Sequence, residues 1–105
     1  MGGAIDKGNI TPAAEFNVFF DPSALKNVLK LKEDIPLVMI PLETTHMNLA
    51  TQDIYNRFKS YSSHPFGLAL YNTMLSYQDF YIRVNKMNDP PYHDPLTIFY
   101  ILHPE

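Results

Sequence analysis

The sequence contains no cysteine. Disulfide bonds and thiolate chemistry are therefore excluded, a reducing compartment is permitted, and we expect a cytoplasmic protein. No block of lysine or arginine occurs and the formal net charge is −3, so we expect no binding to nucleic acid. No run approaches about 18 apolar residues, and the opening MGGAIDKGN lacks the basic start and apolar stretch of a signal peptide. We therefore expect no membrane association and no secretory leader.

What remains is a composition typical of a folded protein. The chain has 105 residues, of which 46% are hydrophobic and 18% charged. This length suits one small domain, and the balance of apolar and charged residues is that of a globular chain, not a disordered one.

Prolines mark most of the predicted helix starts. Pro22 suits the first position of a helix, where its missing N–H has no cost, and Asp21 before it can cap that helix. Thr11 and Pro12 repeat the pattern and predict a second, shorter helical turn. Further helices are predicted at Thr51–Tyr61, from Pro65 to about Val84, and from Pro95.

One segment has the pattern of a buried strand. IPLVMIPLE (Ile35–Glu43) is short, apolar and rich in branched residues, as in parallel sheets that are covered on both faces. Such a strand needs partners for its backbone N–H and C=O groups, and the other candidate, FNVFF, is short and runs into a helix start. We therefore expect a piece of a larger α/β domain, mostly helical and with one or two short strands.

The triplet HDP near the C-terminus has two interpretations. Asp94 can cap a helix that begins at Pro95, or it can be a ligand in an active site. The apolar residues that follow predict that this helix is buried: Leu96, Ile98, Phe99, Ile101 and Leu102.

The stretch GNITPAAEFN is unusual in its polar side chains. Asn9, Glu15 and Asn17 offer two amides and a carboxylate around a proline-initiated turn. This set suits a ligand with many hydroxyl groups, because each hydroxyl both donates and accepts a hydrogen bond. The alternative is structural, with Asn9 in a turn, Glu15 on a solvated helix and Asn17 at a helix end.

Four segments together resemble one family. GNITPAAEFN, FFDPSALKNVL, IPLVMIPLETTH and HDP, in this order and spacing, look like the nucleoside hydrolases of the inosine–uridine-preferring type. The resemblance covers nearly all of the chain but only about a third of a family member, in its middle-to-late part. Residues 1–105 are thus expected to be a partial nucleoside hydrolase domain with a Rossmann-like open sheet.

The resemblance implies substrate-binding roles for five residues, four of them at the ribose. Asn9 and Glu15 match residues that bind the 5′ end of the ribose, and Asn17 matches one that binds the ring hydroxyls. Met1 matches a methionine packed against the sugar, and Phe16 an aromatic residue near the substrate.

The resemblance also implies roles for the leaving group and the metal. His93 matches a histidine that protonates the departing base, and Asp94 matches a calcium ligand. We therefore expect Asp94 to be a ligand that also caps the helix, because a carboxylate has two oxygens. Tyr77 and Tyr81 match tyrosines that cover the base, although their spacing also fits ordinary helix packing. His46 follows the family pattern, but we expect a supporting or core residue and no catalytic role.

The implied activity is calcium-dependent hydrolysis of purine and pyrimidine ribonucleosides to ribose and base, in proteins that are commonly homo-oligomers. The family's aspartate-rich motif, D-x-D-x-x-x-D-D, is absent from this chain. Ca²⁺ takes about six to eight oxygen ligands, so the site is expected to be incomplete and the chain alone inactive. The alternatives are a non-catalytic remnant, an interaction piece or, against the evidence of the lone strand, a free-standing sugar- or calcium-binding module.

Overall fold

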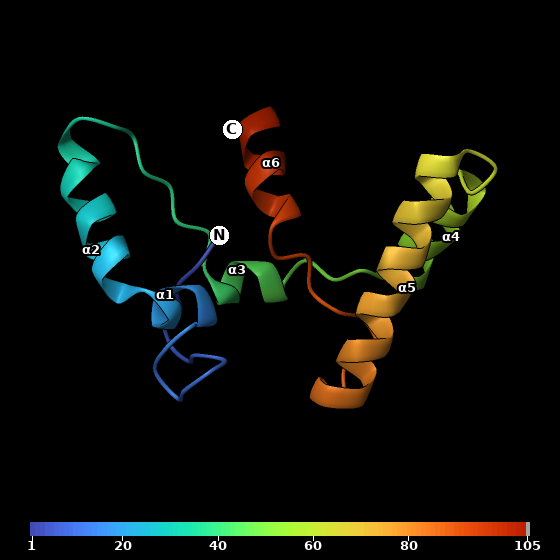
Figure 1. The fold of residues 1–105 in the computed structure, drawn as a ribbon, viewed down its shortest axis with the longest axis horizontal. Coiled ribbons are helices and arrows are strands. Elements are labelled where there is room, and N and C mark those ends of the chain that lie inside the picture. Colours follow the sequence, from blue (N-terminus) through green and yellow to red (C-terminus); the bar gives the residue numbers. More distant parts are fainter. Residues whose placement is uncertain (105) are drawn as a thin grey trace. The chain divides into compact units, whose positions relative to one another are not determined.

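The computed structural model describes residues 1–104 and is built from helices (Figure 1). In chain order these are α1 (Phe16–Phe20), α2 (Pro22–Leu29), the 3₁₀ helix η1 (Lys30–Glu33), α3 (Leu42–His46), α4 (Gln52–Ser60), α5 (Pro65–Asn85) and α6 (Pro95–Leu102). They form two compact units. The first unit is Met1–Met47 together with the segment from His93 onward, and the second is Asn48–Tyr92.

The helices predicted from their prolines are mostly confirmed. Helix α2 begins at Pro22, and the Asp21 carboxylate accepts a hydrogen bond of 2.8 Å from the Ala24 N–H. Helix α5 begins at Pro65, and the cap comes from the His64 ring, whose Nδ1 accepts from the Phe66 N–H at 3.2 Å. Both caps pair a backbone donor that the first turn leaves without an intrahelical partner.

The second unit is a pair of helices, α4 and α5, which pack along each other (Figure 1). Their close approach depends on Gly67, because a Cβ there would collide with the Tyr61 carbonyl. Tyr55 on α4 is almost fully buried, and its hydroxyl oxygen has no hydrogen-bond partner among the described residues. Burial, followed by the charges of Tyr92 and Asp89, raises the pKa of Tyr55 to about 12.

A short antiparallel bridge joins the two chain ends of this unit to each other. Leu49 pairs with Pro91, and the Tyr92 N–H donates to the Asn48 carbonyl at 2.8 Å. The Ala50 N–H donates to the carbonyl preceding Pro91, also at 2.8 Å. The chain therefore enters and leaves the helix pair at adjacent points.

The helical turn predicted at Pro12 is wrong. Thr11 does act as a cap, since its Oγ1 accepts from the Ala14 N–H at 2.9 Å, but the turn does not continue into a helix. Helix α1 begins later, at Phe16, where the Glu15 side chain supplies the cap. FNVFF is this helix, so it is no strand.

The predicted buried strand is also wrong for the described residues, none of which form a named strand. Most side chains of Ile35–Met39 are exposed, and the end of the predicted strand is helix α3. The backbone of the predicted strand is hydrogen-bonded to the N-terminal segment. The Gly2 N–H donates to the Ile40 carbonyl at 3.1 Å, and the Leu42 N–H donates to the Gly3 carbonyl at 3.0 Å. A ladder needs a partner strand, and no neighbouring segment offers one.

The prediction that the last helix is buried is wrong as well. In α6, Ile98, Phe99, Ile101 and Leu102 are between 58% and 69% exposed. Such contiguous apolar surface is unusual on a self-sufficient monomer. Among residues 1–104, no helix is both long enough and apolar enough to cross a membrane.

The exposed apolar face of α6 predicts self-association of the isolated chain. We expect light scattering to detect aggregates, and the double variant Ile98→Ser/Ile101→Ser to raise the monomer fraction severalfold, because it removes apolar surface that water solvates poorly. Gln52→Ser is the control on a polar surface. A wild-type monomer with one cooperative thermal transition contradicts this prediction.

Candidate functional site

The centre of the first unit is the carboxylate of Glu15. This side chain is only 3% exposed, so the alternative of a solvated helix residue is wrong. One oxygen accepts from the Asn17 N–H at 2.9 Å, and the other accepts from the Gly3 N–H at 2.9 Å and the Val18 N–H at 3.3 Å. Glu15 thus starts helix α1 and binds the N-terminal segment with the same group.

A second carboxylate binds the same N-terminal segment. Glu43 Oε1 accepts from the N–H groups of Ile5 and Asp6, both at 3.0 Å. Hydrogen bonds from the backbone of Asp6, of Glu43 itself and of Ile5 lower the pKa of Glu43 to about 2. No sequence signal marks Glu43 as part of the site, because a glutamate after an apolar run shows no sign of which backbone it meets.

The backbone conformation of Gly3 is needed for this approach. Gly3 has a φ of +83°, a conformation that side chains disfavour, and a Cβ there would lie 2.9 Å from the Met39 sulfur. A Cβ at Gly2 would lie 3.4 Å from the Glu15 carboxylate.

The five residues predicted to lie at the ribose or near the substrate all belong to this unit and are linked to one another. Asn9 Oδ1 accepts from the Phe16 N–H at 2.8 Å, so part of its role is to fix the bend, as the alternative proposed. The Asn17 amide donates to the Met1 carbonyl at 3.4 Å and lies 3.7 Å from its sulfur. Asn9, Phe16 and Asn17 are exposed, whereas Met1 is half-buried and Glu15 is buried.

A hollow of about 330 Å³ lies beside Met1 and Asn17. Apolar side chains of α2 and of the segment before α3 line most of it, including Leu25, Val28 and Val38. Among its lining residues in the described part of the chain, Asn17 supplies the only polar side chain. Its surface is therefore too apolar to be a sugar site by itself.

His93 is held by the buried hydroxyl of Thr45. Their Nδ1 and Oγ1 atoms lie 2.9 Å apart, and Thr45 is 0% exposed. The His46 ring lies beside that of His93, with centroids 5.9 Å apart. It is exposed, so of the two expectations the core residue is wrong, and the supporting residue stays a prediction. Burial and the charge of His46 lower the pKa of His93, while Asp94 and Glu15 act in the opposite direction.

The side chain of Asp94 is exposed and makes no capping hydrogen bond to α6, so the prediction that it caps this helix is wrong. Its backbone carbonyl instead accepts from the Thr97 N–H at 3.0 Å and from the Thr97 hydroxyl at 2.7 Å. The carboxylate is thereby left out of the helix start. Across residues 1–104, no group of three or more histidine, aspartate or glutamate side chains could hold a metal ion. These residues do not make a calcium site by themselves.

Tyr77 and Tyr81 lie on one face of α5, in the second unit, with ring centroids 4.8 Å apart. The Tyr77 hydroxyl donates to the Pro91 carbonyl at 2.9 Å. This bond fastens α5 to the segment that leaves the unit, so Tyr77 has a packing role whatever else it does.

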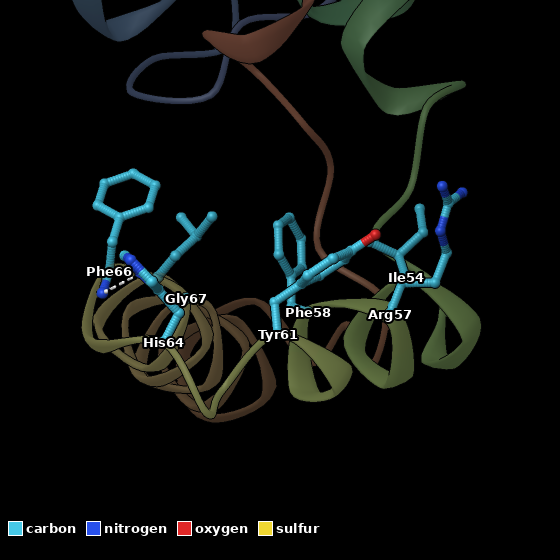
Figure 2. A pocket seen from close by; sticks show the side chains of 8 residues that line it. Ile54, Arg57, Phe58, Tyr61, His64, Phe66 and Gly67 are labelled. Atoms are coloured by element: carbon cyan, nitrogen blue, oxygen red, sulfur yellow. Dashed lines mark hydrogen bonds between the residues drawn. The ribbon is translucent and has the colours of Figure 1, made fainter.

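The second unit also has a pocket that the sequence did not predict (Figure 2). It has a volume of about 530 Å³ and lies where α4 meets the start of α5. Figure 2 shows the rings of Phe58 and Tyr61 among its walls, with the His64–Phe66 cap at one side. Residues from two helices and the turn between them form it, so no local motif announces it.

Comparison with known proteins identifies the class to which this arrangement belongs. The family model described as inosine-uridine preferring nucleoside hydrolase matches residues 1–105. The chain belongs to this family, as its four motifs predicted.

Curated relatives agree with the match. A probable ribonucleoside hydrolase of Dictyostelium discoideum is 33% identical over 109 residues, covering 99% of this chain and 32% of the relative. An inosine-uridine preferring nucleoside hydrolase of Leishmania major is 36% identical over 107 residues, covering 99% and 32%. A pyrimidine-specific ribonucleoside hydrolase of an Enterobacter strain is 36% identical over 110 residues, covering 100% and 33%. The chain thus spans about a third of the length of these relatives.

The lowered pKa of Glu43 predicts a pH-dependent contribution to stability. Its ordinary value is 4.5 and its value in the fold is about 2, so the stabilisation is complete above about pH 4.5 and is lost as the pH falls towards 2. We expect Glu43→Gln to lower the free energy of unfolding at pH 6 more than at pH 3.5. The measurement is denaturant unfolding of a hybrid enzyme, in which residues 1–105 replace the matching third of the Leishmania major relative.

Glu33→Gln in the same hybrid enzyme is the control for removing a carboxylate as such, because Glu33 lies at the surface. A Glu43→Gln loss that stays constant from pH 6 to pH 3.5 contradicts the prediction.

Proposed function

We propose that these 105 residues are part of a ribonucleoside hydrolase, which cleaves the N-glycosidic bond of purine or pyrimidine nucleosides to give ribose and free base. The proposal is supported by membership of the nucleoside hydrolase family and by the names of the relatives. In this proposal the chain carries the residues that bind the ribose and assist the leaving group. The observation that carries this assignment is the anchored imidazole of His93.

The proposal includes a larger α/β fold. Residues 1–105 would be one segment of a domain with an open sheet, and Ile35–Met39 would gain strand partners from parts of the protein outside this segment. The exposure of that segment and of α6 supports this proposal, since both are apolar surfaces without a cover among the described residues.

The ribose would be held by amides arranged around a carboxylate. Asn9 and Asn17 are exposed, and each retains amide groups that can bind hydroxyls. Glu15 accepts three backbone N–H groups, and a carboxylate has about four lone-pair sites, so it has little capacity left for a sugar hydroxyl. We propose that Glu15 contributes mainly by fixing the amides that flank it.

The reaction leaves positive charge on the ribosyl ring as the bond from C1′ to the base breaks. Water supplies the hydroxyl group that ends on C1′, and the base nitrogen keeps the bonding electrons and needs a proton. We propose that the His93 imidazolium donates this proton and that the proton released by water replenishes it. General acid–base assistance of this kind is worth about 10²–10⁴ in rate.

We also propose that Asp94 is one ligand of a calcium ion whose other protein ligands lie outside this chain. Its exposed carboxylate, unused by the helix start, supports this role. Residues 1–104, which the structure describes, do not complete the site, so it is proposed for the whole protein.

The acid role of His93 predicts a dependence on the leaving group. In the hybrid enzyme, we expect His93→Ala to lower kcat for inosine by about 10²–10⁴, and to change kcat little for 4-nitrophenyl riboside. The nitrophenolate departs as a stable anion and needs no proton. The measurement is steady-state kinetics on both substrates.

Asn17→Ala is the matched control, since loss of a ribose contact affects both substrates alike. Equal losses for both substrates in His93→Ala would remove the acid role and leave a structural one.

The incomplete metal site predicts weak binding of Ca²⁺. By isothermal titration calorimetry, we expect the 105-residue chain to bind Ca²⁺ in the millimolar range or not at all, and to release no base from inosine or uridine. One carboxylate cannot replace the oxygen ligands that Ca²⁺ takes, which number about six to eight. In the hybrid enzyme, Asp94→Asn should raise the Ca²⁺ concentration needed for half-maximal activity, with Asp53→Asn as the surface control. Micromolar binding by the chain alone contradicts the prediction.

A further inference from the structure

Thr45 is a buried polar side chain, and no sequence motif explains why it lies in the site. It lies in α3, it is 0% exposed, and its sequence neighbours in the TTH motif are not buried as it is. A fully buried hydroxyl must find partners within the protein, because an unpaired one costs free energy. Thr45 has two partners, the Leu42 carbonyl at 3.0 Å and His93 Nδ1 at 2.9 Å.

These two contacts determine the direction of the hydrogen bonds when His93 is charged. Both ring nitrogens of an imidazolium are donors, so Thr45 Oγ1 must accept from Nδ1. The single proton of the hydroxyl then points to the Leu42 carbonyl, which lies within reach. In helices, threonine commonly donates to a carbonyl one turn back, so this orientation needs no rearrangement.

We propose that Thr45 is a positioning residue for the leaving-group acid, because it holds the His93 ring through Nδ1 so that Nε2 serves the departing base. This inference rests on the proposed function, in which His93 is the acid. The hydroxyl itself touches no substrate. It acts by fixing the plane of the imidazole, and a donor that is misplaced by about 1 Å can lose about 10²-fold in rate.

The sequence separation makes this contact informative. Thr45 and His93 are 48 residues apart, and each lies at a point where the first unit is interrupted by the second. The hydrogen bond therefore joins two segments of the first unit that no local structure brings together. A change at Thr45 should reach the chemistry through His93 alone.

The test is a double-mutant cycle in the hybrid enzyme with Thr45→Val, His93→Ala and both. Valine keeps the shape of threonine and removes the hydroxyl. We expect Thr45→Val to lower kcat for inosine about 10-fold to 10²-fold, to spare 4-nitrophenyl riboside, and to leave KM nearly unchanged. In the His93→Ala background the same change should have little further effect, because a residue that acts through another is not additive with it.

Two further variants separate positioning from simple destabilisation. Thr45→Ser keeps the hydroxyl and should retain most of the inosine activity. Thr73→Val removes an exposed threonine hydroxyl on α5, which also donates to a carbonyl one turn back (Ala69, 2.9 Å), and should leave kcat unchanged for both substrates. Thermal unfolding of each variant reports whether the fold is retained.

The outcomes distinguish the inference from the proposed function. One outcome is that His93→Ala lowers kcat for inosine but not for 4-nitrophenyl riboside, while Thr45→Val lowers kcat for both substrates equally or for neither. The positioning role of Thr45 is then wrong, and the acid role of His93 stands. If His93→Ala does not discriminate, the acid role fails, and the inference fails with it. If Thr45→Val does not fold, the Thr45→Ser variant is the deciding measurement. A Thr45→Ser variant that loses as much kcat for inosine as His93→Ala overturns the proposal.

Discussion

Two acidic side chains accept hydrogen bonds from backbone N–H groups of the N-terminal segment, and these bonds fix where that segment lies. Glu15 takes the N–H of Gly3 together with two N–H groups at the start of α1. Glu43 accepts from two further donors of the segment, at Ile5 and Asp6. Because one carboxylate serves both the segment and the helix, the position of Met1 beside Asn17 depends on Glu15. The residues proposed to contact ribose are thus arranged by a group that has little capacity left to bind it.

His93, the proposed acid, is likewise held by a group that would not itself take part in the reaction. Its ring is held by a hydroxyl from a distant segment, while Asp94, the next residue, leaves its carboxylate outside the start of α6. The two adjacent side chains therefore lie in different surroundings. The His93 ring contacts the buried Thr45 hydroxyl, and the Asp94 carboxylate is exposed to solvent. This arrangement is compatible with the acid and metal roles proposed for the pair.

The sequence predicted the features that depend on local chemistry. Asp21 with Pro22, and Pro65 after His64, start helices because their caps and prolines act within a few residues. The family followed from motifs in a fixed order. The strand predicted at Ile35–Glu43 is not formed among the described residues, because strand formation depends on a partner segment, which its own pattern cannot supply. Thr45 and Glu43 were missed for a similar reason, since their partners lie 48 and 37 to 38 residues away.

The antiparallel bridge between Leu49 and Pro91 has a consequence for how such a protein can vary. It fastens the entry and exit of the α4–α5 pair to each other, so the pair behaves as a cassette inserted between Met47 and His93. Lengthening a loop inside a cassette with fixed ends costs little, about 0.6 kcal/mol for each doubling of its length. The helices, with their tyrosines and their pocket, are free to diverge in sequence and size while the Thr45–His93 contact keeps its geometry. One unit can therefore change in evolution without a compensating change in the sequence of the other.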